Sequence, residues 1–388
     1  MLTGNLGRIQ YANYDFFVGV YPNDVATRKE VQRLANSDSR IHFIVNSKDG
    51  PTSKGQMLNE VVRGILWHES RTGVRYDALL MHDSEDLIHP EALRLINAGL
   101  DHHDFLQIPV FSLPVSPVEW VAGTYMDEFS EVHTKDILVR QSLGAAIPSA
   151  GVGTALSRKL VTTYLKIQEG NLLNPRALTE DYELGVSTKR HGLSSAFLCR
   201  YIPKADGTRD YIATREYFPK SFTRSIRQKT RWTLGISFQG AANLGWYGNL
   251  FDRWFLTRDR KGPFNHLIVA VGLLCALYAA TSAVLHPRFV EKLRHAPFVL
   301  SVVGINSAFM VNRVLQRIWR TSTIYGGSRG LLSALRLPLV NVINAAASLN
   351  AIHQFARSKL LGIEPHWEKT EHELPPDFGN DLPLEETA

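Results

Sequence analysis

Three carboxylates lie close together at Asp83, Glu85 and Asp86. Side chains this close repel one another unless a cation or solvent separates them, and carboxylate oxygens are the ligands that Mg²⁺ and Mn²⁺ prefer. A divalent cation held there could carry a diphosphate. A solvated helix N-terminus would also favour acidic residues, without any metal. The metal site is the favoured hypothesis, because an apolar run at residues 76–81 predicts a strand just before the motif, and ligands bind at the carboxyl ends of such strands.

A second acidic motif, Thr179-Glu180-Asp181, opens a segment that predicts a helix over residues 179–191. Simple helix capping, with Thr179 as the cap, would explain it. Alternatively Asp181, with Glu180 beside it, could accept the proton of an attacking sugar hydroxyl as a general base. One base suffices when the leaving group is a metal-bound diphosphate, because the metal takes up the departing charge. A glycoside hydrolase would instead need two carboxylates that flank the bond.

The third motif is Gln228-Lys229-Thr230-Arg231-Trp232, within a segment that predicts an amphipathic helix over residues 221–240. On a helix, Gln228, Arg231 and Trp232 share one face. This face offers a neutral hydrogen-bonding group, a forked cation and a flat aromatic ring, which could grip a diphosphate and stack on a sugar or base. Arg and Trp also occur together on helices at membrane interfaces, so that role stays open.

Two segments rich in small residues accompany these motifs. Lys54 follows a turn of Gly, Pro and small hydroxyl residues, and could contact phosphate or be an ordinary surface lysine. Gly151 and Gly153 lie in a segment of small residues at 149–154. That segment could let an acceptor sugar approach the backbone closely, or could simply form a tight loop.

The elements that would position these motifs alternate between strands and helices, which predicts an α/β fold with a mostly parallel sheet and flanking helices. Acidic, basic and turn residues then follow the predicted strands, at the edge where ligands bind. Residues 105–153 predict strands and loops. Strands are predicted at 15–21, 41–45 and 76–81, and helices at 26–35, 56–67, 90–98, 158–169, 179–191 and 221–240.

The second half of the chain predicts membrane helices. Residues 267–285 carry no charge and are long enough to span a bilayer, and residues 296–311 form a shorter apolar run. Residues 337–355 are also uncharged but contain Pro338 and three asparagines, so a third span and a re-entrant helix are both open. Cations precede the first run and follow the second. This pattern predicts a hairpin whose short outer loop lies near residues 286–295, with the catalytic part in the cytoplasm.

Composition excludes several classes of function. The net charge of +6 arises largely from basic clusters at 253–261 and 313–336, which suit anionic lipid or phosphate. The sequence contains neither zinc-finger spacing nor an aromatic-basic RNA motif, so nucleic acid is not an expected partner. The two cysteines, Cys199 and Cys275, lie far apart, and a disulfide framework is not expected.

Taken in order, these motifs resemble those of the membrane-embedded family-two glycosyltransferases, which include cellulose and hyaluronan synthases. The likeness covers residues 14–375, nearly the whole chain. The segments that carry it are YPND at 21–24, PTSK at 51–54, HDSEDLIHP at 82–90, MDEFSEVHTKD at 126–136, PSAGVGT at 148–154, LTEDYELG at 178–185, REYFP at 215–219, RQKTRWTLGI at 227–236, RDRKGP at 258–263 and WEKTEHELP at 367–375.

The resemblance implies a GT-A fold that binds a nucleoside-diphosphate sugar, and it implies roles for particular residues. Asp24 would hold the nucleotide with support from Lys54 and Asn59, and Asp83 and Glu85 would place Mg²⁺ or Mn²⁺. Asp181 would be the general base, and Gln228, Arg231 and Trp232 would cover the diphosphate and the acceptor end. Glu85 stands where the family often has Asp, but Glu still binds a hard cation.

Two further departures from the family pattern are expected. Family members begin with membrane helices and a first strand that ends in a loop against the nucleotide, and this chain is expected to lack that strand and part of the donor pocket. Relatives often carry a C-terminal regulatory domain, which is not expected here.

The leading functional hypothesis is a metal-dependent, inverting hexosyl- or N-acetylhexosaminyltransferase of the bacterial inner membrane. It would use a nucleotide sugar, in particular a UDP-sugar, to extend an exopolysaccharide or a lipid-linked acceptor, with an outer-membrane export partner. The alternative is a non-catalytic membrane component of an envelope export or phage-adsorption system. The expected segments are a catalytic domain at 1–220, an interface helix and linker at 221–262, a membrane region at 263–356 and a polar tail at 357–388.

Overall fold

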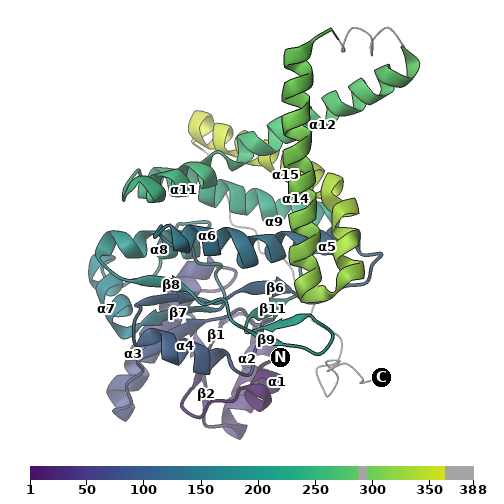
Figure 1. Ribbon diagram of the computed structural model, residues 1–388. Coiled ribbons are helices and arrows are strands. Elements are labelled where there is room, and N and C mark those ends of the chain that lie inside the picture. The colour runs from purple at the N-terminus through teal and green to yellow at the C-terminus, as the bar shows by residue number, and fades with distance from the viewer. Residues whose placement is uncertain (287–294, 363–388) are drawn as a thin grey trace.

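A computed structural model describes residues 1–286 and 295–362 of the chain (Figure 1). Most of the predicted outer loop at 286–295 and most of the predicted polar tail at 357–388 lie outside the described residues. The strand and helix predictions for the first hundred residues are confirmed. These elements are β1 (Phe16–Val20), α2 (Val25–Ser37), β2 (Ile41–Val45), α3 (Lys54–Thr72), β3 (Ala78–Met81) and α4 (Ala92–Leu100). Two short elements, α1 (Leu2–Arg8) and β4 (Leu87–Ile88), were not predicted.

Local sequence signals explain where these helices begin and end. The Asp24 side chain caps α2 by accepting a hydrogen bond from Thr27 N at 3.0 Å. The Ser53 side chain caps α3 in the same way, by accepting from Gln56 N at 3.2 Å. The helix α3 ends at Gly73, whose φ of 75° would be unfavourable for a residue with a side chain. The caps therefore place Lys54 at the first turn of a helix.

The largest sheet has the strand order β3-β7-β5-β8, with β5 at Phe105–Gln107, β7 at Thr154–Ser157 and β8 at Ser195–Phe197. The α/β class is confirmed, but the prediction of a mostly parallel sheet is wrong, because β7 runs antiparallel to both β3 and β5. The pairs β1–β2 and β5–β8 are parallel. Alternation of strands and helices does not fix strand direction when a long excursion, here residues 113–153, separates two strands of one sheet.

Smaller sheets flank this one. The strand β11 (Thr214–Glu216) lies between β4 and β6 (Val110–Ser112), antiparallel to β4 and parallel to β6. The strands β9 (Tyr201–Pro203) and β10 (Arg209–Tyr211) form an antiparallel pair. The principal core lies against β3, β5 and β7, and includes the buried Phe105, Leu156, Leu160, Tyr164 and Phe197.

The middle of the segment between β6 and β7 is helical, so the prediction of strands and loops at 105–153 is wrong for residues 120–142. It forms α5 (Trp120–Glu131), a π-helical turn at Val132–Asp136 and α6 (Ile137–Ser142). The helix α5 buries polar as well as apolar side chains. Its sequence therefore lacks a simple apolar stripe, and the helical period is hidden.

The predicted helices in the middle of the chain are confirmed. They are α7 (Arg158–Ile167), α8 (Glu180–Thr188) and α9 (Phe222–Thr233), the last followed by a π-helical segment at Leu234–Gln239, α10 (Gly240–Leu244) and α11 (Leu250–Arg260). Thr179 stands at the N-cap position of α8, but its side chain makes no capping hydrogen bond.

Three helices in the described part of the chain are long and apolar enough to cross a membrane: α12 (Gly262–Leu285), α14 (Pro297–Tyr325) and α15 (Gly327–Leu361). The helix α12 and the first part of α14 extend away from the sheets (Figure 1), whereas the end of α14 packs against α5 and β10. Only 6% and 0% of their most apolar stretches are buried within the protein, whereas the value for α15 is 44%. The helix α15 runs through Pro338 and packs against α5 and α9. It therefore combines the composition of a span with a face that contacts the rest of the chain.

Candidate active site

Lys54 joins two of the predicted motifs. Its Nζ lies 2.5 Å from Asp83 Oδ1 and donates a hydrogen bond to the Gly151 carbonyl oxygen at 3.2 Å. Lys54 comes from the N-terminus of α3, Asp83 follows β3, and Gly151 precedes β7. The capped start of α3 thus brings a cation to the edge of the sheet where the acidic motif emerges.

Asp181 packs against the same glycine. Gly151 has a φ of 82°, and a methyl group at its Cα would lie only 2.4 Å from Asp181 Oδ2 and 3.5 Å from Lys54 Nζ. Glu180 lies next to α3, since a methyl group on Gly55 would be 3.2 Å from Glu180 Cγ. The loop before β7 therefore needs glycine at position 151 for its backbone conformation and for the close approach of the carboxylate.

The charges in this cluster alter one another's protonation. Burial raises the pKa of Glu180 to about 7, and the neighbouring Asp181 carboxylate adds to the rise. Burial also raises the pKa of Asp181, while Lys54 and Arg231 oppose it. Burial alone would lower the pKa of Lys54, but the carboxylates of Asp83, Asp181 and Glu180 outweigh it, so that this pKa is raised. Lys54 consequently stays cationic, and both acids of the second motif hold their protons to higher pH than exposed carboxylic acids do.

Glu216 was not among the predicted site residues, but it lies beside the first acidic motif. The antiparallel register between β11 and β4, continued by one residue, places Glu216 opposite Asp86. Burial raises the pKa of Glu216 well above its usual value, and the carboxylates of Asp86, Asp83 and Glu85 add to that rise. No periodicity or spacing in the sequence signals this residue, because strand pairing alone brings it to the motif.

Asp86 is the buried member of the first acidic motif. Its side chain is fully buried, and Oδ2 accepts a hydrogen bond from Asp83 N at 2.8 Å and lies 2.9 Å from His82 Nδ1. Its Oδ1 is buried with no hydrogen-bond partner among the described residues. Asn5 on α1 holds the same turn, donating to the Asp86 carbonyl oxygen at 2.8 Å and accepting from Ile88 N at 3.0 Å. Asp86 therefore shapes the turn that presents Asp83.

This donor set suits a hard cation that arrives with a diphosphate. Within residues 1–286 and 295–362, no group of three or more His, Cys, Asp or Glu side chains is placed to hold a metal ion by itself. Mg²⁺ commonly binds through one or two carboxylates and takes its other ligands from phosphates and water. Asp83, Glu85 and Glu216 place carboxyl groups near the Asp86 oxygen that has no hydrogen-bond partner in the described part of the chain, and burial together with their repulsion holds the proton on Glu216. A divalent cation would relieve that repulsion.

The helix α9 brings its motif to the second acidic pair. Arg231 interacts electrostatically with Glu180 and Asp181, since it opposes the rise in both pKa values. Gln228 is 2% exposed, and its Oε1 has no hydrogen-bond partner in the described part of the chain. The Trp232 ring lies edge-on to Tyr125 of α5, with centroids 6.3 Å apart. Gln228 Oε1 could thus accept a hydrogen bond from a ligand, whereas Trp232 packs partly on protein.

Three predicted site residues make contacts of a more structural kind. The Asp24 carboxylate caps α2 through Thr27. The Asn59 amide is buried and holds the loop at residues 172–173, accepting from Leu172 N at 2.9 Å and donating to the Leu173 carbonyl oxygen at 2.8 Å. A methyl group on Gly153 would lie 2.5 Å from Thr214 Oγ1. Gly153 therefore allows the chain just before β7 to pack closely against β11 of the neighbouring sheet.

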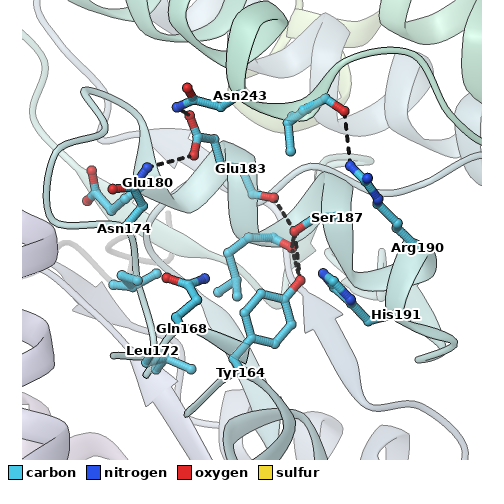
Figure 2. Close-up of a pocket in the computed structure, with 13 residues that line it drawn as sticks. Tyr164, Gln168, Leu172, Asn174, Glu180, Glu183, Ser187, Arg190, His191 and Asn243 are labelled. Atoms are coloured by element: carbon cyan, nitrogen blue, oxygen red, sulfur yellow. Dashed lines mark hydrogen bonds between the residues drawn. The ribbon is translucent and has the colours of Figure 1, made fainter. Parts of the chain in front are cut away.

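A cavity of about 320 Å³ lies beside α8 and is lined partly by residues of that helix (Figure 2). Glu180 lines it together with Glu183, which accepts hydrogen bonds from Asn243 Nδ2 at 2.6 Å and Asn174 Nδ2 at 3.3 Å. The Tyr164 hydroxyl lies 2.7 Å from Ser187 Oγ in the same wall. These hydrogen bonds tie the wall of the cavity to α8, the helix that carries the second acidic motif.

The comparisons with known proteins agree with this geometry. The sequence profile described as "Glycosyltransferase like family 2" matches residues 1–235. The chain belongs to the family-2 glycosyltransferases. All the motifs placed at the site lie within the matched residues, and members of this family generally use a divalent metal.

Curated relatives of this glycosyltransferase extend the likeness through the helices that follow. The chain is 35% identical over 395 aligned residues to the Bacteriophage adsorption protein B of Escherichia coli strain K12, and equally to the Bacteriophage N4 adsorption protein B of Escherichia coli O157:H7. In each case the match covers 96% of this chain and 52% of the relative. The chain thus spans about half the length of the curated relatives it matches.

Proposed function

We propose that this chain transfers a sugar from a nucleotide sugar, in particular a UDP-sugar, to a growing exopolysaccharide or lipid-linked acceptor, with inversion at the anomeric carbon. The observation that carries the proposal is the contact between Asp181 and Gly151, with Lys54 joining the same glycine to Asp83. A base, a cation and an acidic motif therefore meet around one small residue, where an acceptor hydroxyl could approach.

In the proposed reaction, the acceptor hydroxyl oxygen forms a bond to the anomeric carbon of the donor while the bond from that carbon to the diphosphate oxygen breaks. Asp181 accepts the hydroxyl proton, helped by the partly protonated Glu180 beside it, whose pKa of about 7 suits proton transfer near neutral pH. Lys54 and Arg231 stabilise the charge that develops on the departing diphosphate. Gly151 leaves room for the acceptor, and Gly153 supports the same turn.

The donor would lie between the sheet edge and α9. Gln228 and Arg231 would contact the diphosphate, and Trp232 would present the exposed part of its ring to the acceptor end. Asp24 would bind the nucleotide, and Asn59 would support the pocket through the loop at residues 172–173.

Asp83 and Glu85 would hold Mg²⁺ or Mn²⁺, with Asp86 behind them. The cation, when bound, would neutralise the diphosphate as it leaves. Glu216 adds a further carboxylate to this set, opposite Asp86 in the sheet.

The proposed location is the bacterial inner membrane, with the catalytic part in the cytoplasm and α12 and α14 as a hairpin. Cations lie at the end of α11, directly before α12, and in the second half of α14, as the positive-inside rule expects. On α11, Leu250 and Trp254 are 78% and 62% exposed. Large apolar side chains exposed beside the start of a candidate span suit a lipid surface.

The direct test is nucleotide release by the full-length chain in detergent, with UDP-sugar donors and Mn²⁺ or Mg²⁺. Asp181→Asn should abolish turnover and leave donor affinity unchanged within about twofold, because it removes the base without removing the groups that grip the diphosphate. Absence of nucleotide release with every donor tested would refute the proposal.

The name of the relatives favours a second candidate, a non-catalytic component of a phage-adsorption or envelope export system that acts with an outer-membrane partner. Calorimetry separates the two candidates. Metal-dependent binding of a nucleotide sugar supports the enzyme, whereas absence of such binding in a folded chain supports the non-catalytic component.

A further inference from the structure

A buried polar triangle fixes the helix that carries Gln228, Arg231 and Trp232. Lys229 of α9 forms an ion pair with Glu128 of α5 and donates a hydrogen bond to Asn344 Oδ1 of α15 at 2.8 Å. Asn344 Nδ2 donates in turn to Glu128 Oε1 at 2.9 Å. The triangle closes only when the Asn344 oxygen faces the ammonium and its nitrogen faces the carboxylate, so each side chain holds the other two in place.

The Lys229 side chain is well shielded from solvent. The residue is 7% exposed, and Nζ lies 5.1 Å from the centroid of the Tyr125 ring. The ring face gives the ammonium a further favourable neighbour. A lysine is rarely buried without a partner, because burial of an unpaired charge is costly. This one therefore depends on Glu128 and Asn344 together.

The same face of α5 pairs with the apolar helices at two further points. Arg336 of α15 forms a bidentate ion pair with Asp127, in which Nε donates to Oδ2 at 2.8 Å and Nη2 donates to Oδ1 at 2.7 Å. Nη1 of Arg317 on α14 lies 3.3 Å from Glu131 Oε2. Neighbouring carboxylates on one helix thus bind cations from α15, α9 and α14. The short helix α5 is the point where the apolar helices and the helix of the proposed donor site are fixed to one another.

Contacts beside the triangle fix the rotation of α9 about its own axis. The Thr230 hydroxyl donates to the Ala347 carbonyl oxygen at 3.3 Å, and the Tyr125 hydroxyl lies 2.9 Å from Ser225 Oγ. Lys229 and Thr230 therefore point toward α5 and α15. Gln228 and Arg231, which flank them, are turned toward other neighbours, and Arg231 acts on Glu180 and Asp181.

We propose that Lys229, Glu128 and Asn344 are positioning residues that set the rotation of α9 over the donor site, and that α15 is the platform against which this helix is held. The proposal rests on the proposed sugar transfer for its kinetic consequence. Its structural part, the fixing of α9, stands apart from catalysis. A shift of about 1 Å in Arg231 would be enough to impair the reaction.

The experiment compares Lys229→Met, Glu128→Gln and the double variant with the unaltered full-length chain in detergent. Arg227→Met is the matched control, because Arg227 is an exposed cation on the same helix. We expect kcat/KM for the donor to fall about 10- to 100-fold in each single variant, with a higher KM, and to stay within about twofold in the control. The double variant should lose less than the product of the two single losses, because it leaves no unpaired charge.

Hydrogen exchange supplies a readout that does not need turnover. Amides of α9 should exchange faster in Lys229→Met than in Arg227→Met, while those of β3, β5 and β7 stay unchanged. If the unaltered chain transfers no sugar, the proposed function fails, and the exchange result still decides whether the triangle positions α9. If Lys229→Met does not fold, Asn344→Ala takes its place, because it removes the bridge and leaves the ion pair. Kinetics and exchange equal to those of the control would overturn the proposal.

Discussion

Gly151→Ala tests the contact on which the proposed base depends. The new methyl group would lie 2.4 Å from Asp181 Oδ2, whereas contacts of a Cβ below 3.0 Å are essentially never seen. The carboxylate must therefore move by at least about 0.6 Å. Displacements approaching 1 Å at a reacting group cost up to about 100-fold in rate, so we expect kcat to fall about 10- to 100-fold.

The backbone cost of this substitution can be separated from the clash. Position 151 has a φ of 82°, where an alanine costs about 1–2 kcal/mol relative to glycine. Gly144→Ala is the matched control, because Gly144 has a φ of 65° and open space around its Cα. Both variants should lose about 1–2 kcal/mol of stability to the backbone conformation, and Gly151→Ala should lose more because of the clash with Asp181, as thermal unfolding would measure.

Nucleotide release with a UDP-sugar donor should then distinguish the two alanine variants. The Gly144→Ala chain should keep its activity within about twofold, whereas Gly151→Ala should not. Equal activity of the two variants, measured at a temperature where both are folded, would refute the placement of Asp181 as the reacting base.

Further predictions follow from the buried charges. Because the pKa of Glu180 is raised to about 7 and that of Asp181 is also raised, activity should fall as pH drops through about 7, which a pH–rate profile checks. The raised Glu180 pKa also means that the folded state holds an extra proton between about pH 4.5 and 7, so unfolding free energy should fall as pH rises through that window. Arg336→Met leaves the Asp127 carboxylate buried and unpaired, and should lower the unfolding free energy by about 3–5 kcal/mol in denaturant titrations in detergent. Glu216→Gln should keep the melting temperature unchanged or raise it, because it mimics the protonated acid, and should increase the Mn²⁺ concentration needed for half-maximal activity.

The sequence predicted those features that rest on local patterns. Apolar runs at 15–21 and 41–45 became β1 and β2, and the helices predicted at 26–35 and 56–67 became α2 and α3. The uncharged run at 267–285 became α12, because length and apolarity alone define a candidate span. The motifs at Lys54, Asp83 and Asp181 could be ordered along the chain, and predicted strand ends indicated that Lys54 and Asp83 would lie at the ligand-binding edge of the sheet.

Features that depend on distant partners could not be predicted in the same way. The polar face of α5 conceals its helical period, since Asp127 and Glu128 are buried against Arg336 and Lys229, more than a hundred residues away in each case. The antiparallel insertion of β7 depends on how a long excursion returns to the sheet. Glu216 reaches the acidic motif only through the pairing of β11 with β4.

The sequence by itself therefore determined which residues could do chemistry and which segments could enter a membrane, because residue type, spacing and local apolarity act over a few residues. Only the tertiary structure decided which charges are paired. It brought Lys54 between Asp83 and Gly151, placed Arg231 near Asp181, and buried the triangle of Lys229, Glu128 and Asn344. The physical reason is that a buried charge is tolerated only beside its partner, and the partner is chosen by the packing of whole helices and strands.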